Sequence, residues 1–499
     1  MSRWGLMLVH LLLLTGVTDA RAVKTDLRAL LTDPARAWAP STTLSFIGTR
    51  QFNDATERWT VFSPPTYKAA ISPETEEDVR KAIKLATSYN IPFLVTGKRH
   101  GYTTTLRGLK DGLAIDLSRM NSINVNAAAE TVTIGPGVTA GDIFDPLYNA
   151  GFEIQTGSAS CPSLIGVALG GGVGRFTGLY GLLIDALVSA RMVTASGQVI
   201  EVSEKSHSDL FWAIRGAGAN FGAVTSATFK VHPLRNRGDV LSADFLFPAE
   251  KASQYFKAVE AFNHKLPAEL ASITIVMWNS STNATQVGAN WVYLGPEKEG
   301  RKVLAPLIKL KPVYSNIQVV KWNRLVATAG GGVEAATCED NLVRDLYSLN
   351  LRNYSASTAA SSFSKMSDFF STYPGGRTSI LQFEYFPNQA MAAVPLERTA
   401  WPWRQTTGYI NPNMIWGPGD AVTQKAAQAL GRELRDDFRA TSGFEGPRVF
   451  VNYARGDETL EQIYSKQNLP RLSNLKKQWD PKNAFSFNNA IPSRYVPKH

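Results

Sequence analysis

The segment that most constrains this chain is residues 209–222, which read DLFWAIRGAGANFG. It begins with apolar residues at helical spacing: Leu210, Phe211 and Ile214. It ends with three glycines, Gly216, Gly218 and Gly222. A run rich in β-branched residues, Val224 to Val231, follows and predicts a strand. Glycines at such a junction let the backbone pass close to a bulky ligand, because they add no Cβ and tolerate positive φ. Taken alone, the segment also suits an ordinary tight turn.

Two more glycine-flanked loops lie upstream. Residues 169–175 read LGGGVGR, and residues 96–102 read TGKRHGY at the end of an expected strand. The flanks of the first loop are too apolar for a flexible linker, so we expect an ordered turn there. His100 in the second loop is either a hydrogen-bonded loop histidine or a reactive side chain. Three such loops in one chain favour a large bound ligand over chance.

Composition and charge exclude several classes of protein. The 499 residues suffice for two or more domains, and 44% hydrophobic with 19% charged residues is typical of a globular protein. The formal net charge is +10, but the basic residues are scattered and form no block longer than a pair such as Lys476-Lys477. We therefore expect a solvated basic surface and no nucleic-acid partner. We also expect no metal site.

The first 22 residues have the pattern of a secretory signal peptide. An apolar run from Leu6 to Leu14 precedes a small-x-small site at Ala20-Arg21-Ala22, and the run is too short to span a bilayer. We therefore expect a protein that is secreted or enters the secretory lumen, with no membrane attachment after signal removal. Three glycosylation sequons agree with this route and would lie on the surface: Asn279, Asn283 and Asn353. The two cysteines, Cys161 and Cys338, are too few for a disulfide scaffold.

The chain divides into three parts after a lead-in over residues 23–60. In residues 60–236 a β-α-β pattern begins with a strand over Tyr67–Ile71, a helix opened by Ser72-Pro73-Glu74, and a strand over 91–96. Ser196-Gly197 predicts a hairpin turn between runs 187–195 and 198–202. Residues 237–447 alternate strand-like and helix-like runs, which indicates an antiparallel sheet backed by helices. Residues 448–499 are expected to pack back on the first domain.

The three glycine loops together resemble the flavin-cradling loops of the FAD-linked oxidases related to vanillyl-alcohol oxidase, in the berberine-bridge-enzyme-like branch. Near the end, residues 448–454 (RVFVNYA) resemble the family's Tyr-x-Asn-Tyr segment, with Phe450 in place of the first tyrosine, and residues 480–485 (DPKNAF) match its closing motif. The resemblance is strong over residues 60–235 and the tail and weak between them. It implies an α+β protein with a two-lobed FAD-binding domain over 60–236 and an α+β substrate domain with an antiparallel sheet over 237–447.

The cofactor implied by the resemblance is FAD, bonded covalently through His100 to the 8α carbon of the flavin. This chain departs from the family by carrying Lys98 and Arg99 where glycines are common. These cations either pair with the pyrophosphate or point to solvent. With His100, the residues expected to bind the cofactor are Thr96, Gly97, Lys98, Arg99, Gly101, Gly170, Gly171, Gly172, Gly174, Gly216, Gly218, Asn220, Val224, Asn483 and Asn488.

A second flavin bond, which some relatives form through a cysteine, is not expected here. The usual cysteine position falls on Ala159, and Cys161 comes two residues later. We therefore expect one covalent link. Cys161 is then a buried thiol, the favoured interpretation, or a partner of Cys338.

Two residues are candidates for proton transfer. In relatives the second tyrosine of the terminal motif, here Tyr453, takes a proton from the substrate hydroxyl; with an ordinary pKa of about 10 it needs neighbours that lower this value. A hydrogen-bonded core tyrosine is the alternative. On the expected strand 381–386, alternation places Glu384 with Gln382 on one face. Glu384 is the second candidate base, or else an exposed glutamate.

The resemblance implies oxidation of a small organic molecule by hydride transfer to flavin N5, with O₂ as the reoxidant and H₂O₂ as its product. Aromatic residues of the substrate domain suit a flat conjugated molecule, such as a polyketide or alkaloid intermediate of fungal secondary metabolism: Trp278, Trp291, Tyr385, Trp401 and Trp403. An oligosaccharide oxidase would use the same aromatics to stack sugars. A secreted binding protein that keeps the fold without turnover is the alternative from another class.

Overall fold

The first sheet of the N-terminal lobe contains four strands. In the computed structural model, which describes residues 26–496, β2 (Tyr67–Ser72) and β3 (Phe93–Thr96) both pair parallel with β4 (Gly112–Asp116). The crossover helix α3 (Glu76–Ser88) packs on them, so the predicted β-α-β unit is confirmed. On the other edge, β1 (Thr43–Phe46) pairs antiparallel with β2. This lobe therefore begins before residue 60.

The start of α3 differs from the prediction. The helix begins at Glu76, and Thr75 caps it by accepting a hydrogen bond from Asp78 N. Ser72 cannot cap it because it is still part of β2, where it pairs with Thr43 and donates to Asp116. Long-range pairing has extended the strand into the segment where local signals placed a helix.

The second sheet of this lobe is antiparallel and runs in the order β5-β6-β10-β8-β9. Its strands are β5 (Ile123–Asn126), β6 (Thr131–Ile134), β8 (Leu187–Val193), β9 (Val199–Ser203) and β10 (Ala223–Lys230). The predicted β8–β9 hairpin is confirmed. The packed helices include α4 (Ala140–Asn149), α5 (Leu164–Gly170), α6 (Thr177–Tyr180) and α7 (Ser208–Ala217). As predicted, α7 ends in glycines and leads into β10.

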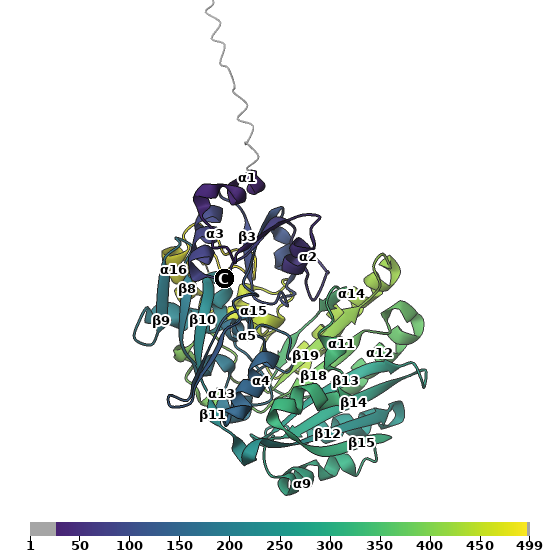
Figure 1. Cartoon of the computed structure of the whole chain (residues 1–499). Coiled ribbons are helices and arrows are strands. Elements are labelled where there is room, and N and C mark those ends of the chain that lie inside the picture. Colours follow the sequence, from purple (N-terminus) through teal and green to yellow (C-terminus); the bar gives the residue numbers. More distant parts are fainter. Residues whose placement is uncertain (1–25, 497–499) are drawn as a thin grey trace, which may run out of the picture.

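The second lobe is built on one large antiparallel sheet, visible at the lower right of Figure 1. Its order is β15-β12-β14-β13-β18-β19-β16, with β17 also pairing β19. The strands are β12 (Asp239–Pro248), β13 (Leu270–Asn279), β14 (Ala284–Tyr293), β15 (Tyr314–Lys321), β16 (Arg344–Leu346), β17 (Leu349–Leu351), β18 (Ile380–Tyr385) and β19 (Gly408–Ile415). The covering helices are α8 (Ala252–Glu260), α9 (Glu297–Ile308), α12 (Ala356–Thr372) and α14 (Ala421–Thr441). The predicted helix-backed antiparallel sheet is confirmed.

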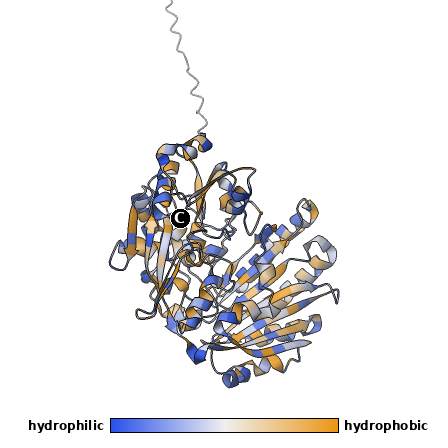
Figure 2. Ribbon diagram, in the orientation of Figure 1, coloured by the Kyte–Doolittle hydropathy of each residue, from blue (hydrophilic) through white to orange (hydrophobic). Residues whose placement is uncertain are grey.

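The two faces of this sheet have different roles, and its strands carry both hydrophobic and hydrophilic segments (Figure 2). On β18, Phe383 and Tyr385 pack with Phe256 in the core beneath the helices, whereas Glu384 points the other way, toward the first lobe. Trp291 and Trp278 also pack on the helix side. The expectation that these tryptophans and Tyr385 stack a substrate is therefore wrong, because the helices already cover them.

The C-terminal segment returns to the first lobe as predicted. Helices α15 (Leu460–Tyr464) and α16 (Leu469–Trp479) add to the core that holds α7. Lys476 is fully buried and donates to Asp480, at 2.7 Å, and to the carbonyl oxygens of Asn220 and Phe485. Asp480 also accepts hydrogen bonds from the backbone N–H groups of Ala484 and Phe485. Lys476 thus stabilises the conformation of the closing motif, residues 480–485, and is not part of a basic surface.

The remaining helices and strands are short: α1 (Leu27–Thr32), α2 (Arg50–Thr56), β7 (Phe152–Glu153), β11 (His232–Pro233), α10 (Leu325–Thr328), α11 (Glu334–Thr337) and α13 (Gln389–Ala393). Within residues 26–496, none of the helices has the length and apolarity needed to cross a bilayer. The same residues contain no cluster of three or more His, Cys, Asp or Glu side chains suited to a metal ion.

Candidate active site

A buried acid–base pair lies between the two lobes. Glu384 on β18 is 2% exposed and accepts a hydrogen bond from Tyr453 Oη, in the short 3₁₀ turn Val451–Tyr453, at 2.9 Å. Its other carboxyl oxygen accepts from Gln382 Nε2 at 3.1 Å. The interpretation of Glu384 as an exposed glutamate is therefore wrong, and the two candidate bases form one unit.

The environment divides the roles within this pair. Burial raises the pKa of Glu384 to about 7, although Tyr453, Arg175 and Gln382 favour its charged form. Burial and the negative charge of Glu384 raise the pKa of Tyr453 well above its ordinary value. The neighbours therefore do not lower the pKa of Tyr453, which a free tyrosinate base would need. Glu384 is the group of the pair that titrates near neutral pH.

Two further tyrosines surround the pair, and sequence reasoning did not select them. Tyr409 on β19 lies directly across the strand pair from Glu384, and its ring is 6.1 Å from that of Tyr453. Tyr102 lies close enough for the charge of Glu384 to raise its pKa. Among residues 26–496, neither hydroxyl has a hydrogen-bond partner. Tyr102 could have been selected from the sequence because it lies two residues after His100. Tyr409 could not, because its position opposite Glu384 depends on the register of β18 and β19, which only the fold shows.

His100 lies in the loop after β3 and stacks on Trp59, with ring centroids 5.5 Å apart. The Arg344 guanidinium lies over the same tryptophan, 4.3 Å from its ring centroid. Burial lowers the pKa of His100 to about 4, and the charges of Arg344, Arg58 and Arg99 act in the same direction. The imidazole is therefore neutral at physiological pH and keeps a nitrogen lone pair.

The two cations of this loop have separate environments. Arg99 forms an ion pair with Asp116 at 2.6 Å and donates to the Glu57 carbonyl oxygen. Its guanidinium is thus occupied within the protein rather than directed at a pyrophosphate or at solvent. Lys98 is half-buried and makes no ion pair with the described chain. Gly97, after Thr96 at the end of β3, lies so close to Pro136 that an added Cβ would sit 2.4 Å from its carbonyl oxygen.

The glycine loops lie in close contact with two segments from later in the chain, those of Trp401 and Asn452. A Cβ at Gly170 would lie 1.9 Å from Asn452 Oδ1, and one at Gly216, where φ is +129°, would lie 2.5 Å from Trp401 N. Asn452 also donates to the Val167 carbonyl oxygen at 2.9 Å. The loops therefore seat Asn452, and with it the neighbouring Tyr453. The other glycines expected to bind cofactor are also tightly packed by protein: Gly171, Gly172, Gly174 and Gly218.

Trp401 and Trp403 serve packing as well. Trp401 lies against Gly171 and Gly216, and Trp403 donates its indole N–H to the Ile463 carbonyl oxygen at 3.0 Å. With the three aromatics beneath the helices, this accounts for all five residues expected to stack a flat substrate. The substrate-facing side chains must be sought elsewhere.

The other expected cofactor residues differ in what they offer. The amide of Asn220 is occupied on both sides, by Tyr464 Oη at 3.2 Å and the Ile491 N–H at 2.9 Å. Asn488 accepts from the side chain of Asn489. Val224 lies on β10 just before a bulge. Strand β6 pairs with β10 only from Ala227 onward, so β6 does not pair with Val224. Gly101 is exposed, and its carbonyl oxygen accepts from Arg58.

The residues present fit an FAD. Buried polar atoms are normally hydrogen-bonded, so unpartnered ones mark places where a ligand or water belongs. Around the loops that the resemblance assigns to the flavin, the side-chain atoms buried without a partner in the described chain include Arg58 Nη1, Tyr102 Oη, Ser158 Oγ and Asn483 Oδ1. These atoms include both hydrogen-bond donors and hydrogen-bond acceptors, and FAD needs both, because its ring system is a polar heterocycle and its tail is a diphosphate.

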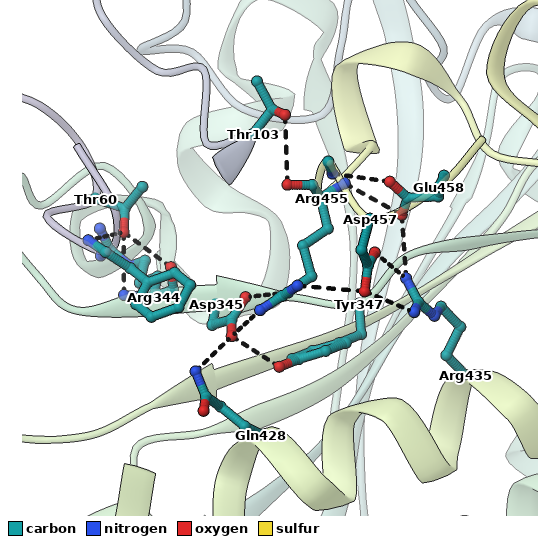
Figure 3. A network of polar contacts seen from close by, with 12 residues as sticks. Thr60, Thr103, Arg344, Asp345, Tyr347, Gln428, Arg435, Arg455, Asp457 and Glu458 are labelled. Carbon is teal, nitrogen blue, oxygen red and sulfur yellow. Dashed lines mark hydrogen bonds and ion pairs between the residues drawn. The ribbon is translucent and has the colours of Figure 1, made fainter. Parts of the chain in front are cut away.

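A polar network fixes the segment that follows Tyr453 (Figure 3). Asp345 is 1% exposed, and its carboxylate accepts hydrogen bonds from Arg455 Nε at 2.6 Å and Nη2 at 3.0 Å. It also accepts a hydrogen bond from Tyr347 Oη at 2.8 Å. The Arg455 carbonyl oxygen accepts from Thr104 N at 2.6 Å, in the loop after His100. The network thus connects the segment of Tyr453 both to β16 of the large antiparallel sheet and to the segment that follows His100.

A disulfide joins the lobes on another side of the site. Cys161 is bonded to Cys338, so the favoured interpretation of Cys161 as a buried thiol is wrong. The segment before Cys338 is also held by hydrogen bonds: Ser160 N donates to Glu334 at 2.6 Å, and Trp59 Nε1 donates to the Thr337 carbonyl oxygen at 2.7 Å. A sulfur committed to Cys338 is not available to a flavin, in keeping with the expected single link.

Comparisons with known proteins agree with this geometry. Residues 67–203 match the FAD binding domain family, and residues 449–492 match the family described as berberine and berberine like. An FAD-linked oxidoreductase of Aspergillus ruber is 47% identical over 479 residues, covering 95% of this chain and 96% of the relative. One of Pyricularia oryzae is 45% identical, covering 91% and 90%.

Solved structures show the same fold at lower identity. A chitooligosaccharide oxidase has a TM-score of 0.79 at 23% identity and covers 94% of this chain and 100% of its own. The glucooligosaccharide oxidase of Acremonium strictum, which has a 6-S-cysteinyl, 8α-N1-histidyl FAD, has a TM-score of 0.81 at 20% identity and covers 94% of this chain and 100% of its own.

The two lobes and their shared polar site define an FAD-dependent enzyme. More particularly, the chain belongs to the family of fungal FAD-linked oxidoreductases with a berberine-like C-terminal segment. The family, the α+β fold and FAD as the cofactor, all expected from the glycine loops and terminal motifs, are thereby confirmed.

Proposed function

We propose that this protein is an oxidase of a small conjugated molecule, in which Tyr453 and Glu384 together remove the substrate proton and His100 carries the flavin. The observation that supports this most is the Tyr453–Glu384 hydrogen bond of 2.9 Å, buried between the lobes. A perturbed carboxyl group that shares a hydrogen bond in such an interface is typical of acid–base catalysis.

The two residues act together as a proton relay. The bound FAD supplies a hydride acceptor, which O₂ later reoxidises. Tyr453 Oη accepts the hydroxyl proton of the substrate while its own proton passes to Glu384 Oε2, so the tyrosine never carries a free charge. The pKa of about 7 for Glu384 suits a base that works near neutral pH. The surrounding burial excludes water from this transfer.

His100 is proposed as the single attachment point of the flavin. Its neutral imidazole makes no hydrogen bond within residues 26–496, so either ring nitrogen is available for a bond to the 8α carbon. An electron-withdrawing imidazole there would make the flavin a better hydride acceptor and keep the cofactor bound. Because Cys161 is joined to Cys338, we propose no cysteinyl bond.

A conjugated secondary metabolite remains our proposal for the substrate class. The relatives of high identity are named FAD-linked oxidoreductases, whereas the oligosaccharide oxidases share the fold at 23% identity or less. The tryptophans expected to stack a substrate of either class, such as Trp291 and Trp403, are held in the protein core or by a backbone contact and so favour neither class.

Anaerobic flavin reduction tests the assignment. A substrate is first found by screening candidate phenolic and polyketide alcohols for H₂O₂ release. Tyr453→Phe and Glu384→Gln are each expected to slow flavin reduction by about 10²–10⁴-fold. Tyr385→Phe, a control on the same strand but the opposite face, is expected to retain the wild-type rate. Wild-type reduction rates for both site variants would contradict the proposal, and no reduction by any candidate would favour a binding protein.

We also propose passage through the secretory route. The signal sequence of residues 1–22 lies outside the described residues, and support comes from the disulfide, which oxidising compartments favour. Asn283 lies exposed at the β13–β14 turn, whereas Asn279 and Asn353 are half-buried. A mass decrease on glycosidase treatment, abolished in large part by Asn283→Gln, is expected. Secreted material without glycan at Asn283 would contradict the glycosylation assignment, and retention of the leader sequence would contradict export.

A further inference from the structure

The residue before His100 has a backbone conformation that L amino acids rarely adopt. The φ angle of Arg99 is +57°, in the left-handed region that favours glycine. This chain carries an arginine at a position where glycine is common in the family. In an L residue this conformation costs free energy, and it persists only where the surrounding structure holds it. The contacts of the Arg99 side chain therefore have to supply the restraint.

Two fixed acceptors hold the Arg99 guanidinium. Its Nη1 forms an ion pair with Asp116 Oδ1 at 2.6 Å, and its Nε donates to the Glu57 carbonyl oxygen at 2.8 Å. Asp116 is buried, and its other carboxylate oxygen accepts from Ser72 Oγ at 3.1 Å and from Ser118 Oγ at 2.8 Å. A charge-assisted contact to a carboxylate that is itself held in place restrains the arginine strongly.

A second left-handed arginine shows what distinguishes Arg99. Arg237 has a similar φ of +55°, but its side chain is exposed in the turn Arg235–Gly238. The side chain of Arg99 is only 16% exposed, and it pairs with a carboxylate in the first sheet. Arg99 thus combines the unusual backbone with a fixed side chain, directly before the histidine proposed to carry the flavin.

The backbone is held on both sides of His100 by the short segment that follows α2. On one side, the first residue of this segment accepts from Arg99. On the other side, Arg58 Nη2 donates to the Gly101 carbonyl oxygen. Between these contacts the Trp59 ring stacks on the imidazole, with ring centroids 5.5 Å apart. The direction in which His100 projects is therefore set by its two neighbours in the loop and by Trp59.

We propose that Arg99 is a positioning residue for flavin attachment: its ion pair with Asp116 holds the backbone before His100 in the left-handed conformation, which aims the imidazole at the 8α carbon. In this chain the side-chain contacts replace the backbone freedom that a glycine would provide. A reaction between two held groups depends on the alignment of the reacting atoms, so a small rotation of the loop is expected to slow attachment.

This inference rests on the proposed function, which places the flavin bond on His100. In the attachment step a bond forms between an imidazole nitrogen and the 8α carbon. The imidazole N–H bond and one C–H bond of the 8α methyl group break, which releases two protons and two electrons. The electrons reduce the flavin, and O₂ then takes them up with two protons as H₂O₂. Arg99 takes no part in these bond changes and acts only through the position of His100.

The rate of covalent attachment tests the proposal without substrate turnover. The full chain is produced in a riboflavin-limited host and mixed with saturating FAD in air, and covalent flavin is followed by the fluorescence of the denatured protein. Arg99→Ala removes the side-chain contacts but keeps the cost of the left-handed backbone, so attachment is expected to slow by about 5–30-fold. Arg99→Gly removes the same charge but also removes that cost, and is expected to stay within about threefold of the wild type.

A second comparison tests whether Asp116 acts through Arg99. Asp116→Asn removes the counter-charge and is expected to slow attachment by about 3–10-fold in the wild-type chain. In the Arg99→Gly background the same change is expected to have less than about a twofold effect, because the arginine is absent. Arg119→Gln is the matched control. It removes an exposed cation three residues after Asp116, which pairs with Glu74, and is expected to change nothing.

Several results would overturn the proposal. Arg99→Ala that attaches flavin at the wild-type rate would show that residue 99 does not position His100. Arg99→Gly that is as slow as Arg99→Ala would assign the loss to the missing charge instead of the backbone. Equal effects of Asp116→Asn in both backgrounds would make Asp116 a residue of general structural importance. Absorbance before denaturation measures FAD that is bound without a covalent link, and loss of this binding in Arg99→Ala would also contradict a positioning role.

The failure of this inference can be told apart from the failure of the proposed function. A wild-type chain that never carries flavin on His100 contradicts the proposed attachment itself. Normal attachment in the wild type with unchanged rates in the variants contradicts only the role of Arg99. If Arg99→Ala does not fold, the two Asp116→Asn comparisons decide the question. If the flavin-free chain does not stay folded, the covalent fraction in cells at fixed times after induction gives the same comparisons.

Discussion

Tyr453 donates its hydroxyl proton to Glu384 across 2.9 Å, and the two residues reach this contact from different parts of the chain. Glu384 comes from the interior strand β18 of the large antiparallel sheet, and Tyr453 comes from the C-terminal segment that packs on the glycine loops through Asn452. The chemistry proposed for this protein therefore depends on how the lobes are held together.

The pKa of Glu384 predicts a pH-dependent effect on stability. Because folding raises this pKa from 4.5 to about 7, its contribution to stability is present below about pH 4.5 and is lost as the pH rises through 7. Glu384→Gln keeps an acceptor for Tyr453 without the charge. We expect it to raise the free energy of unfolding by about 3 kcal/mol at pH 8 and to change it little at pH 4.5. Urea denaturation at both pH values measures this, with Glu77→Gln as the exposed control, and equal effects at both would contradict the buried-charge account.

The network behind Tyr453 predicts a strong difference between two aspartates that bind the same arginine. Asp345→Asn leaves Arg455 without its buried counter-ion, which is expected to destabilise the fold by about 3–5 kcal/mol. The side chain of Asp457 is 33% exposed, so Asp457→Asn is expected to cost less than about 1 kcal/mol. Similar losses for both variants would show that the interface does not depend on the buried pair.

Removal of the disulfide separates its structural role from flavin attachment. The double variant Cys161→Ser/Cys338→Ser is expected to lower the free energy of unfolding by about 2–5 kcal/mol, because the bond closes a long loop. Covalent flavin content and the visible spectrum are expected to stay as in the wild type. Loss of covalent flavin, or a peptide in which one flavin bridges His100 and Cys161, would disprove the single-link assignment.

Local patterns in the sequence predicted the elements well, because side-chain periodicity reports which face of an element is buried. The alternation over 381–386 correctly separated Glu384 from Phe383 and Tyr385. The predicted helix start at Ser72 failed because that residue pairs with Thr43 in a strand, a contact that local signals do not encode.

Site residues were harder to predict wherever their role depends on long-range packing. Trp291 lies in the core because the helices cover its face of the large sheet. Tyr409 lies opposite Glu384 because of the register between β18 and β19. The Cys161–Cys338 bond spans 177 residues of sequence. The glycine motifs were found correctly as a group, but the fold shows that several of them make room for Trp401 and Asn452.

The most direct test of the account is the location of the flavin after denaturation. Acid-precipitated wild-type protein is expected to stay yellow, and mass spectrometry of its peptides is expected to find flavin on the peptide that contains His100 and none on the peptide of Cys161. His100→Ala is expected to lose the covalent flavin, while His207→Ala, which changes an exposed histidine, is expected to keep it. Flavin that is fully extractable from the wild-type protein, or attached to another residue, would contradict the account.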